Sequence, residues 1–82
     1  MIEVNAVEVG PEYALVLTFN SSERRLFDMR PCLAYPVFRR LRNRGFFALA
    51  RVAYGTVTWP GDIDIAPETL YDRSAPLNMK IC

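Results

Sequence analysis

The chain has 82 residues, of which 51% are hydrophobic, and a formal net charge of +1. This length allows one modest hydrophobic core, and the apolar content excludes a compositionally disordered chain. No apolar run approaches the ~18–20 residues of a membrane-spanning helix, and the first residues do not resemble a signal peptide. We therefore expect one cytoplasmic domain over residues 1–82, with its core in residues 2–72 and a flexible tail over 73–82.

Alternating apolar residues predict three strands in the first part of the chain. Residues 2–9 alternate but change phase after Ala6, as a strand with a bulge does. Gly10-Pro11 is a turn signal, and residues 13–19 then give the clearest strand. Residues 24–29 return as a third strand, with Phe27 and Met29 on one face.

A short helix is predicted to begin near Pro36, because proline is well tolerated in the first turn of a helix. A helical period of 3.6 residues places Val37, Phe38 and Leu41 on one face and the neighbouring arginines elsewhere. Gly45 is the expected C-terminal cap of this helix.

Two further strands and a helical turn are predicted in the second half of the chain. Residues 47–54 and 56–59 form a hairpin that turns at Gly55, and Trp59 is expected to fill the core. A proline-initiated helical turn follows over residues 67–71. The fold class is therefore α+β: a small antiparallel sheet with one short helix packed on it, in the order β-β-β-α-β-β plus a terminal helical turn.

No catalytic constellation is apparent in the sequence. Histidine, the commonest general base and neutral metal ligand, is absent. Cys32 and Cys82 lack metal-type spacing, and we expect two unbridged thiols. Cys32 is expected to be a half-buried small hydrophobe; the alternative is a reactive thiol whose pKa nearby arginines lower. We expect no enzyme activity and no cofactor.

An acidic cluster follows the hairpin and leaves a second interpretation open. Asp62, Asp64 and Glu68 offer oxygen ligands of the kind that hard cations prefer, but their spacing is not that of a calcium loop. A turn and a helix N-terminus explain these acids without a ligand, so we expect no metal site. The alternative function is a protein that binds a metal or small ligand, or an enzyme, through these acids and Asp28.

Positive charge is concentrated in the middle of the chain. Residues 24–51 contain eight of the ten basic residues but only one of the nine acidic residues. The densest run is Arg39, Arg40, Arg42 and Arg44. These arginines could contact a protein partner, contact nucleic-acid phosphates, or only face solvent.

The segment Trp59–Tyr71, WPGDIDIAPETLY, resembles the closing signature of the family called domain of unknown function 2442. Leu26–Met29 resembles the family's strand that ends in Asp, and Val37–Leu41 resembles its short helix. The residues that match the signature are expected to be structural: Asp28, Trp59, Pro60, Asp64, Pro67, Leu70 and Tyr71. The resemblance covers residues 2–72 and implies a small α+β fold without an established activity. It also implies that some members are encoded beside a small protein of another uncharacterised family, in an arrangement like a toxin–antitoxin pair.

These observations predict a non-enzymatic binding module that acts through a protein partner and resembles an antitoxin or regulator. The neighbouring gene's product is the first candidate partner, and self-association into a homo-oligomer remains open. The expected interaction surface consists of Arg39, Arg40, Arg42 and Arg44. The alternative is a nucleic-acid-binding accessory protein that uses the same arginines.

Overall fold

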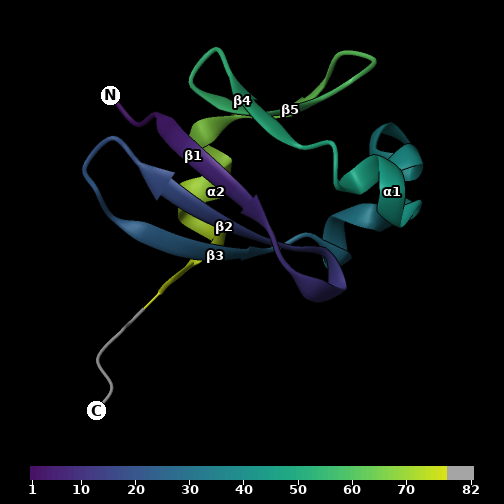
Figure 1. The fold of residues 1–82 in the computed structure, drawn as a ribbon, viewed down its shortest axis with the longest axis horizontal. Coiled ribbons are helices and arrows are strands. Elements are labelled where there is room, and N and C mark those ends of the chain that lie inside the picture. Colours follow the sequence, from purple (N-terminus) through teal and green to yellow (C-terminus); the bar gives the residue numbers. More distant parts are fainter. Residues whose placement is uncertain (78–82) are drawn as a thin grey trace.

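The structure is a computed structural model that describes residues 1–77, and its first sheet follows the predicted strands. This sheet has three long antiparallel strands, β1 (Val4–Val9), β2 (Ala14–Phe19) and β3 (Arg24–Asp28) (Figure 1). The register of β1 against β2 shifts between Val4 and Ala6, which confirms the predicted bulge. The 3₁₀ helix η1 (Pro11–Tyr13) makes the turn that Gly10-Pro11 predicts.

The second sheet contains three short antiparallel strands in the order β4 (Arg51–Ala53), β5 (Thr56–Trp59) and β6 (Ile63–Ile65). Tyr54 and Gly55 connect β4 to β5 with φ angles of 56° and 76°, so the predicted hairpin is confirmed. The third strand, β6, was not predicted, and neither was the division of the strands into two sheets.

The helical region is more irregular than predicted. It comprises two 3₁₀ helices, η2 (Arg30–Ala34) and η3 (Pro36–Arg42), and one turn of α-helix, α1 (Arg44–Phe47). Because a 3₁₀ helix repeats every three residues, Phe38 and Leu41 share the inner row. Val37 falls in another row and is 61% exposed, so its predicted place on the buried face is wrong.

The end of this helical region also differs from the prediction. Gly45 lies inside α1 and caps no helix; instead, the Asn43 side chain accepts a hydrogen bond from the Phe46 N–H and caps the N-terminus of α1. Phe47 belongs to α1 because its N–H bonds to the Asn43 carbonyl at 2.9 Å. The strand predicted over residues 47–54 is therefore reduced to β4.

The predicted proline-initiated turn is confirmed and is longer than expected. It forms α2 (Pro67–Arg73), with Pro67 in its first turn. Of the tail expected from residue 73, Ser74 is buried, and Ala75–Pro76 form the short strand β7, which pairs with β3. Residues 78–82 of that tail lie outside the described residues.

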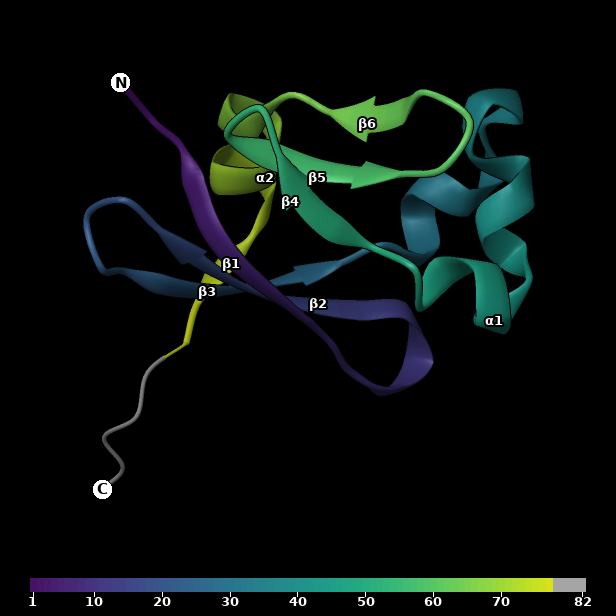
Figure 2. The same cartoon turned by 45° about the horizontal axis from the view of Figure 1, so that its top comes forward.

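The hydrophobic core lies where the two sheets, α2 and the helical region meet. Figure 2 shows the β4–β5–β6 sheet over one side of the β1–β2–β3 sheet, with α1 at one end. Trp59 is 2% exposed and donates its indole N–H to the Phe47 carbonyl at 2.9 Å, as a core tryptophan should. The expected small α+β fold is confirmed. No helix among residues 1–77 is long and apolar enough to cross a membrane.

Candidate functional site

The four arginines singled out by the sequence lie together on the helical region. We call Arg39, Arg40, Arg42 and Arg44 the arginine surface; all four are exposed. Because side chains three residues apart eclipse one another in a 3₁₀ helix, η3 aligns Arg39 with Arg42 in one row. Side chains at this spacing on a helix are neighbours, and two like charges there are mildly unfavourable.

The arginine surface has no ion pair with a carboxylate among residues 1–77, whereas other arginines of the chain do. Arg42 instead donates from Nε to the Leu33 carbonyl at 3.0 Å, and Arg44 lies 5.7 Å from the centre of the Tyr13 ring. Arg40 reaches across to the β5–β6 loop, where a Cβ atom on Gly61 would lie 2.7 Å from its Nη1 atom. The guanidinium groups therefore keep most of their hydrogen-bonding capacity.

Exposed apolar side chains surround the arginine surface. Tyr35, Val37 and Leu49 are 54%, 61% and 52% exposed. A shallow cavity of about 460 Å³, which we call the α1 groove, lies beside Arg40. The residues that line it are Arg40, Asn43, Gly45, Phe46 and Leu49. Arginine and aromatic side chains are enriched in protein–protein interfaces, so the composition of this region fits a contact surface.

A second polar cluster, which was not predicted from the sequence, surrounds Arg25. This side chain points into the core from β3 and is 9% exposed. It donates to the Ser74 hydroxyl, the Ser74 carbonyl and a Glu23 carboxylate oxygen, each at 2.7 Å. The Tyr71 hydroxyl donates a hydrogen bond to the other Glu23 carboxylate oxygen at 2.7 Å, and the Arg25 guanidinium lies 4.2 Å from the centre of the Tyr71 ring. We call these four residues the Arg25 network.

The Arg25 network joins the end of α2 to the β2–β3 turn and to β3. The hydrogen bond from Tyr71 and the one from Arg25, in that order, hold the pKa of the Glu23 carboxyl below its usual value. The same Glu23–Tyr71 bond raises the pKa of the Tyr71 hydroxyl. Glu23 is therefore an anion at neutral pH, and Tyr71 is neutral.

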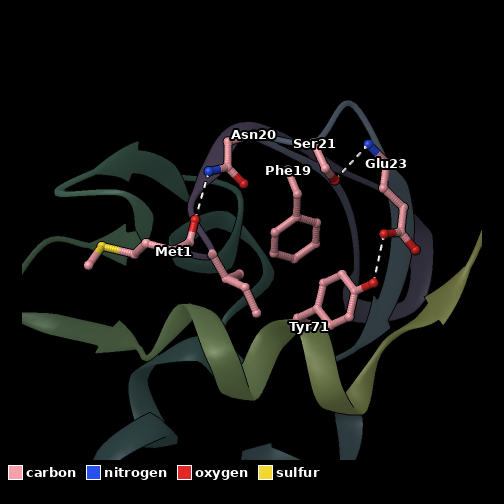
Figure 3. Close-up of a pocket in the computed structure, with 7 residues that line it drawn as sticks. Met1, Phe19, Asn20, Ser21, Glu23 and Tyr71 are labelled. Carbon is pink, nitrogen blue, oxygen red and sulfur yellow. Dashed lines mark hydrogen bonds between the residues drawn. The ribbon is translucent and has the colours of Figure 1, made fainter.

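Glu23 and Tyr71 also line an open pocket of about 480 Å³ beside this network (Figure 3). Its floor is apolar, with the Phe19 and Tyr71 rings in edge-to-face contact at 5.2 Å. The Asn20 amide donates to the Met1 carbonyl at 2.8 Å and so ties the first residues to the rim of the pocket. Both Glu23 carboxylate oxygens already accept hydrogen bonds from within the protein, so these contacts explain the position of the carboxylate without a bound ligand.

One signal in the sequence could have revealed the Arg25 network. Arg25 alternates with Phe27 and Met29, which are both buried, so it occupies a core-facing position of β3. A buried arginine needs a carboxylate and several acceptors. Its partners Tyr71 and Ser74 lie more than 40 residues away, and no local pattern in the sequence identifies them.

The remaining signature residues have local structural surroundings. Asp28 accepts hydrogen bonds from the Arg30 guanidinium and from the Arg30 backbone N–H, each at 3.0 Å, and these bonds, in that order, hold the pKa of its carboxyl below the usual value. Leu70 and Trp59 lie in the core. Pro60 and Asp64 are exposed, on the β5–β6 loop and on β6 opposite Thr58, respectively.

The structure separates the acids of the predicted cluster. Asp62 and Asp64 both line a cavity on the second sheet, and Glu68, at the start of α2, does not. Within residues 1–77, no three metal-ligating side chains come together. Asp62 instead occupies a left-handed turn position with φ 62°, next to Gly61 at φ 88°.

Cys32 is half-buried, in agreement with the expected small hydrophobe. Burial is the main cause that raises the pKa of its thiol, against a smaller lowering by Arg73. The direction of this shift is opposite to the lowered pKa that the reactive-thiol alternative requires. Cys82 lies outside the described residues.

Comparison with protein families identifies a match over nearly the whole chain. The model of the family described as "Protein of unknown function (DUF2442)" matches residues 4–76, which span both sheets and both polar clusters. No curated protein and no solved structure matches this chain.

Proposed function

The chain belongs to the DUF2442 family of proteins of unknown function, and we propose that it is a non-enzymatic module that binds a protein partner. The arginine surface and the α1 groove form the contact region. The partner presents carboxylates to Arg39 and Arg40 and inserts an apolar side chain into the groove. In this proposal the chain resembles an antitoxin or regulator, and the product of the neighbouring gene is the partner.

The observation that carries this proposal is the absence of carboxylate partners for the arginine surface within residues 1–77. The chain has acids to pair with, since Glu23 and Asp28 bind Arg25 and Arg30 at 2.7 and 2.9 Å. The aligned Arg39 and Arg42 repel each other, and no carboxylate among the described residues offsets that repulsion. Carboxylates from a partner would relieve it on binding.

The aliphatic neighbours favour a protein over a nucleic acid. Val37 and Leu49 are more than half exposed on the same region as the arginines. A phosphate backbone offers charge to the arginines but no apolar group for a groove of this kind. A protein surface offers both, and aromatic, arginine and apolar anchors in pockets dominate the energy of such interfaces.

Direct binding to the purified product of the neighbouring gene tests the proposal. We expect capture by the wild-type chain and a loss of affinity of about tenfold or more for the Arg39→Glu, Arg40→Glu double variant. Leu49→Asp should weaken binding separately, because it places a charge in the α1 groove. The matched control is Arg73→Glu, which reverses an exposed arginine at the end of α2 and should bind like wild type.

Three outcomes would overturn the proposal. One is a lack of binding to the neighbouring product, and another is equal binding by wild type and the Arg39→Glu, Arg40→Glu variant. The third is tight binding to duplex or single-stranded nucleic acid that falls steeply with salt, because it would assign the same arginines to phosphate contacts.

A further inference from the structure

The face of the β1–β2–β3 sheet that points away from the core is unusual for a solvent-facing surface. The strand β2 reads Ala-Leu-Val-Leu-Thr-Phe and contains no charged residue. Leu15, Leu17 and Phe19 are buried on the inner side, and Ala14, Val16 and Thr18 therefore point outward. An antiparallel strand with one wet side normally carries polar residues on that side. The central strand of this sheet thus has the pattern of a strand covered on both faces.

The neighbouring strands extend this apolar centre. Register places Leu26 of β3 beside Val16, and Ala75 of β7 beside Leu26, on the same outer face. Leu26 is 40% exposed, and Ala75 is exposed as well. In Figure 2 the second sheet lies on the opposite, inner side. We call the patch formed by Ala14, Val16, Thr18, Arg24, Leu26 and Asp28 the outer face.

The charges of the outer face are arranged symmetrically about Leu26. Arg24 lies two residues before it and Asp28 two residues after it, so all three side chains point to the same side of β3. If β3 strands of two copies cross antiparallel at Leu26, each Arg24 lies opposite Asp28 of the other copy. On β2, Ala14 lies two residues before Val16 and Thr18 two residues after it, so Ala14 of each copy lies opposite Thr18 of the other. This arrangement is self-complementary, which a two-fold interface requires.

We propose that the outer face binds the outer face of a second copy of this chain and forms a two-fold symmetric dimer. The two sheets pack face to face, with Leu26 and Val16 at the centre and Arg24–Asp28 pairs at both ends. A partner with charge of one sign would match only one end of β3, whereas a second copy matches both. This surface is separate from the arginine surface, so the two proposals stand independently.

Arg24 and Asp28 each have one ion-pair partner within residues 1–77 and can also contact a second copy. Arg24 lies 3.9 Å from Glu8, and both side chains are well exposed, at 45% and 75%. Asp28 binds Arg30 at 2.9 Å, but its side chain is still 48% exposed, and a carboxylate can accept several hydrogen bonds. Glu8 lies beside Val16 in the same cross-strand row, on the edge strand β1, where its side chain reaches water and lies near Arg24.

Sedimentation over a concentration series tests the dimer directly. The wild-type chain should shift from monomer to dimer as concentration rises, and Leu26→Lys should remain a monomer. The matched control is Tyr54→Lys, which changes an exposed side chain in the turn between β4 and β5, outside both proposed surfaces, and should dimerise like wild type. A wild-type chain that stays monomeric throughout, or a Leu26→Lys variant that dimerises normally, overturns the proposal.

Charge exchange tests the register of the two copies. Arg24→Asp and Asp28→Arg should each self-associate about tenfold or more weakly than wild type, because each places like charges opposite one another. A mixture of the two variants should form a heterodimer. In that mixture the first variant carries carboxylates at both positions and the second carries guanidinium groups at both, so every facing pair is of opposite charge.

Thermal melting of each variant shows whether its fold is intact, which matters most for Asp28→Arg because that change also removes the contacts to Arg30. The Arg24→Asp, Asp28→Arg double variant should recover self-association and provides an independent readout. Failure of both the mixture and the double variant to associate overturns the proposed arrangement.

Discussion

The Arg25 network and the arginine surface place the same side chain in opposite surroundings. Arg25 is 9% exposed, and a carboxylate, a hydroxyl, a carbonyl and an aromatic ring satisfy its guanidinium. The arginines of η3 and α1 are exposed and have no carboxylate partner within residues 1–77. A buried charge needs hydrogen-bonding partners within the fold, whereas water solvates an exposed charge, which stays available to another molecule. We therefore expect the Arg25 network to support stability, and we place the proposed partner contact at the arginine surface.

The largest expected effect on stability comes from Arg25→Ala. This change removes the bonds to Ser74 and Glu23 and leaves their acceptors without a donor. We expect a loss of about 2–3 kcal/mol in the free energy of unfolding, measured with urea. The counterpart on the arginine surface, Arg39→Ala, should change it by less than about 0.5 kcal/mol. Equal effects of the two substitutions would remove the distinction between the regions.

The next effect is a pH dependence that belongs to Glu23. The pKa of this carboxyl is lower in the folded state than in the unfolded state, because Tyr71 and Arg25 donate hydrogen bonds to the carboxylate. Its contribution to stability is therefore present above the unfolded pKa and is lost as pH falls through the folded pKa.

Glu23→Gln tests this dependence, because it removes the titrating group while the amide oxygen can still accept a hydrogen bond from the Tyr71 hydroxyl. We expect unfolding free energies measured from neutral pH down to acid to fall less steeply for Glu23→Gln than for wild type. Asp28 also has a lowered pKa and contributes in both proteins, so the difference between the two curves isolates Glu23. Curves that coincide would contradict this account of the network.

The smallest expected effect is a slight gain in stability from Arg39→Glu. The change replaces a repulsion between Arg39 and Arg42 by an attraction at the same spacing, and such pairs are worth about 0.2–0.5 kcal/mol. Urea unfolding at low salt measures the gain, which should shrink as salt screens the charges. A loss as large as that of Arg25→Ala would mean that Arg39 supports the fold.

Local patterns predicted those parts of the fold that local sequence determines. Alternation gave the three strands of the first sheet, and the phase change after Ala6 predicted the bulge. Gly55 predicted the hairpin turn, and the size of Trp59 predicted its burial. The strand β6 was missed because its three residues fall within an acidic segment, although Ile63 and Ile65 alternate and are both buried.

Other features depend on geometry that the sequence does not display. Val37 was misplaced because the segment forms a 3₁₀ helix, in which the repeat of three residues moves it out of the row of Phe38 and Leu41. The Arg25 network joins residues that are 48 and 49 positions apart, so it exists only in the folded chain. The arginines were identified from their density alone, while their lack of carboxylate partners within residues 1–77 became visible only in the structure.

The most direct test of the proposed division is a map of backbone amide shifts by nuclear magnetic resonance during titration with the purified product of the neighbouring gene. We expect the largest changes on residues 35–49, around the arginine surface and the α1 groove. The amides of Glu23, Arg25 and Ser74 should change little, because that network is already satisfied. Changes concentrated at the Arg25 network or on the outer face, with residues 35–49 unaffected, would contradict it.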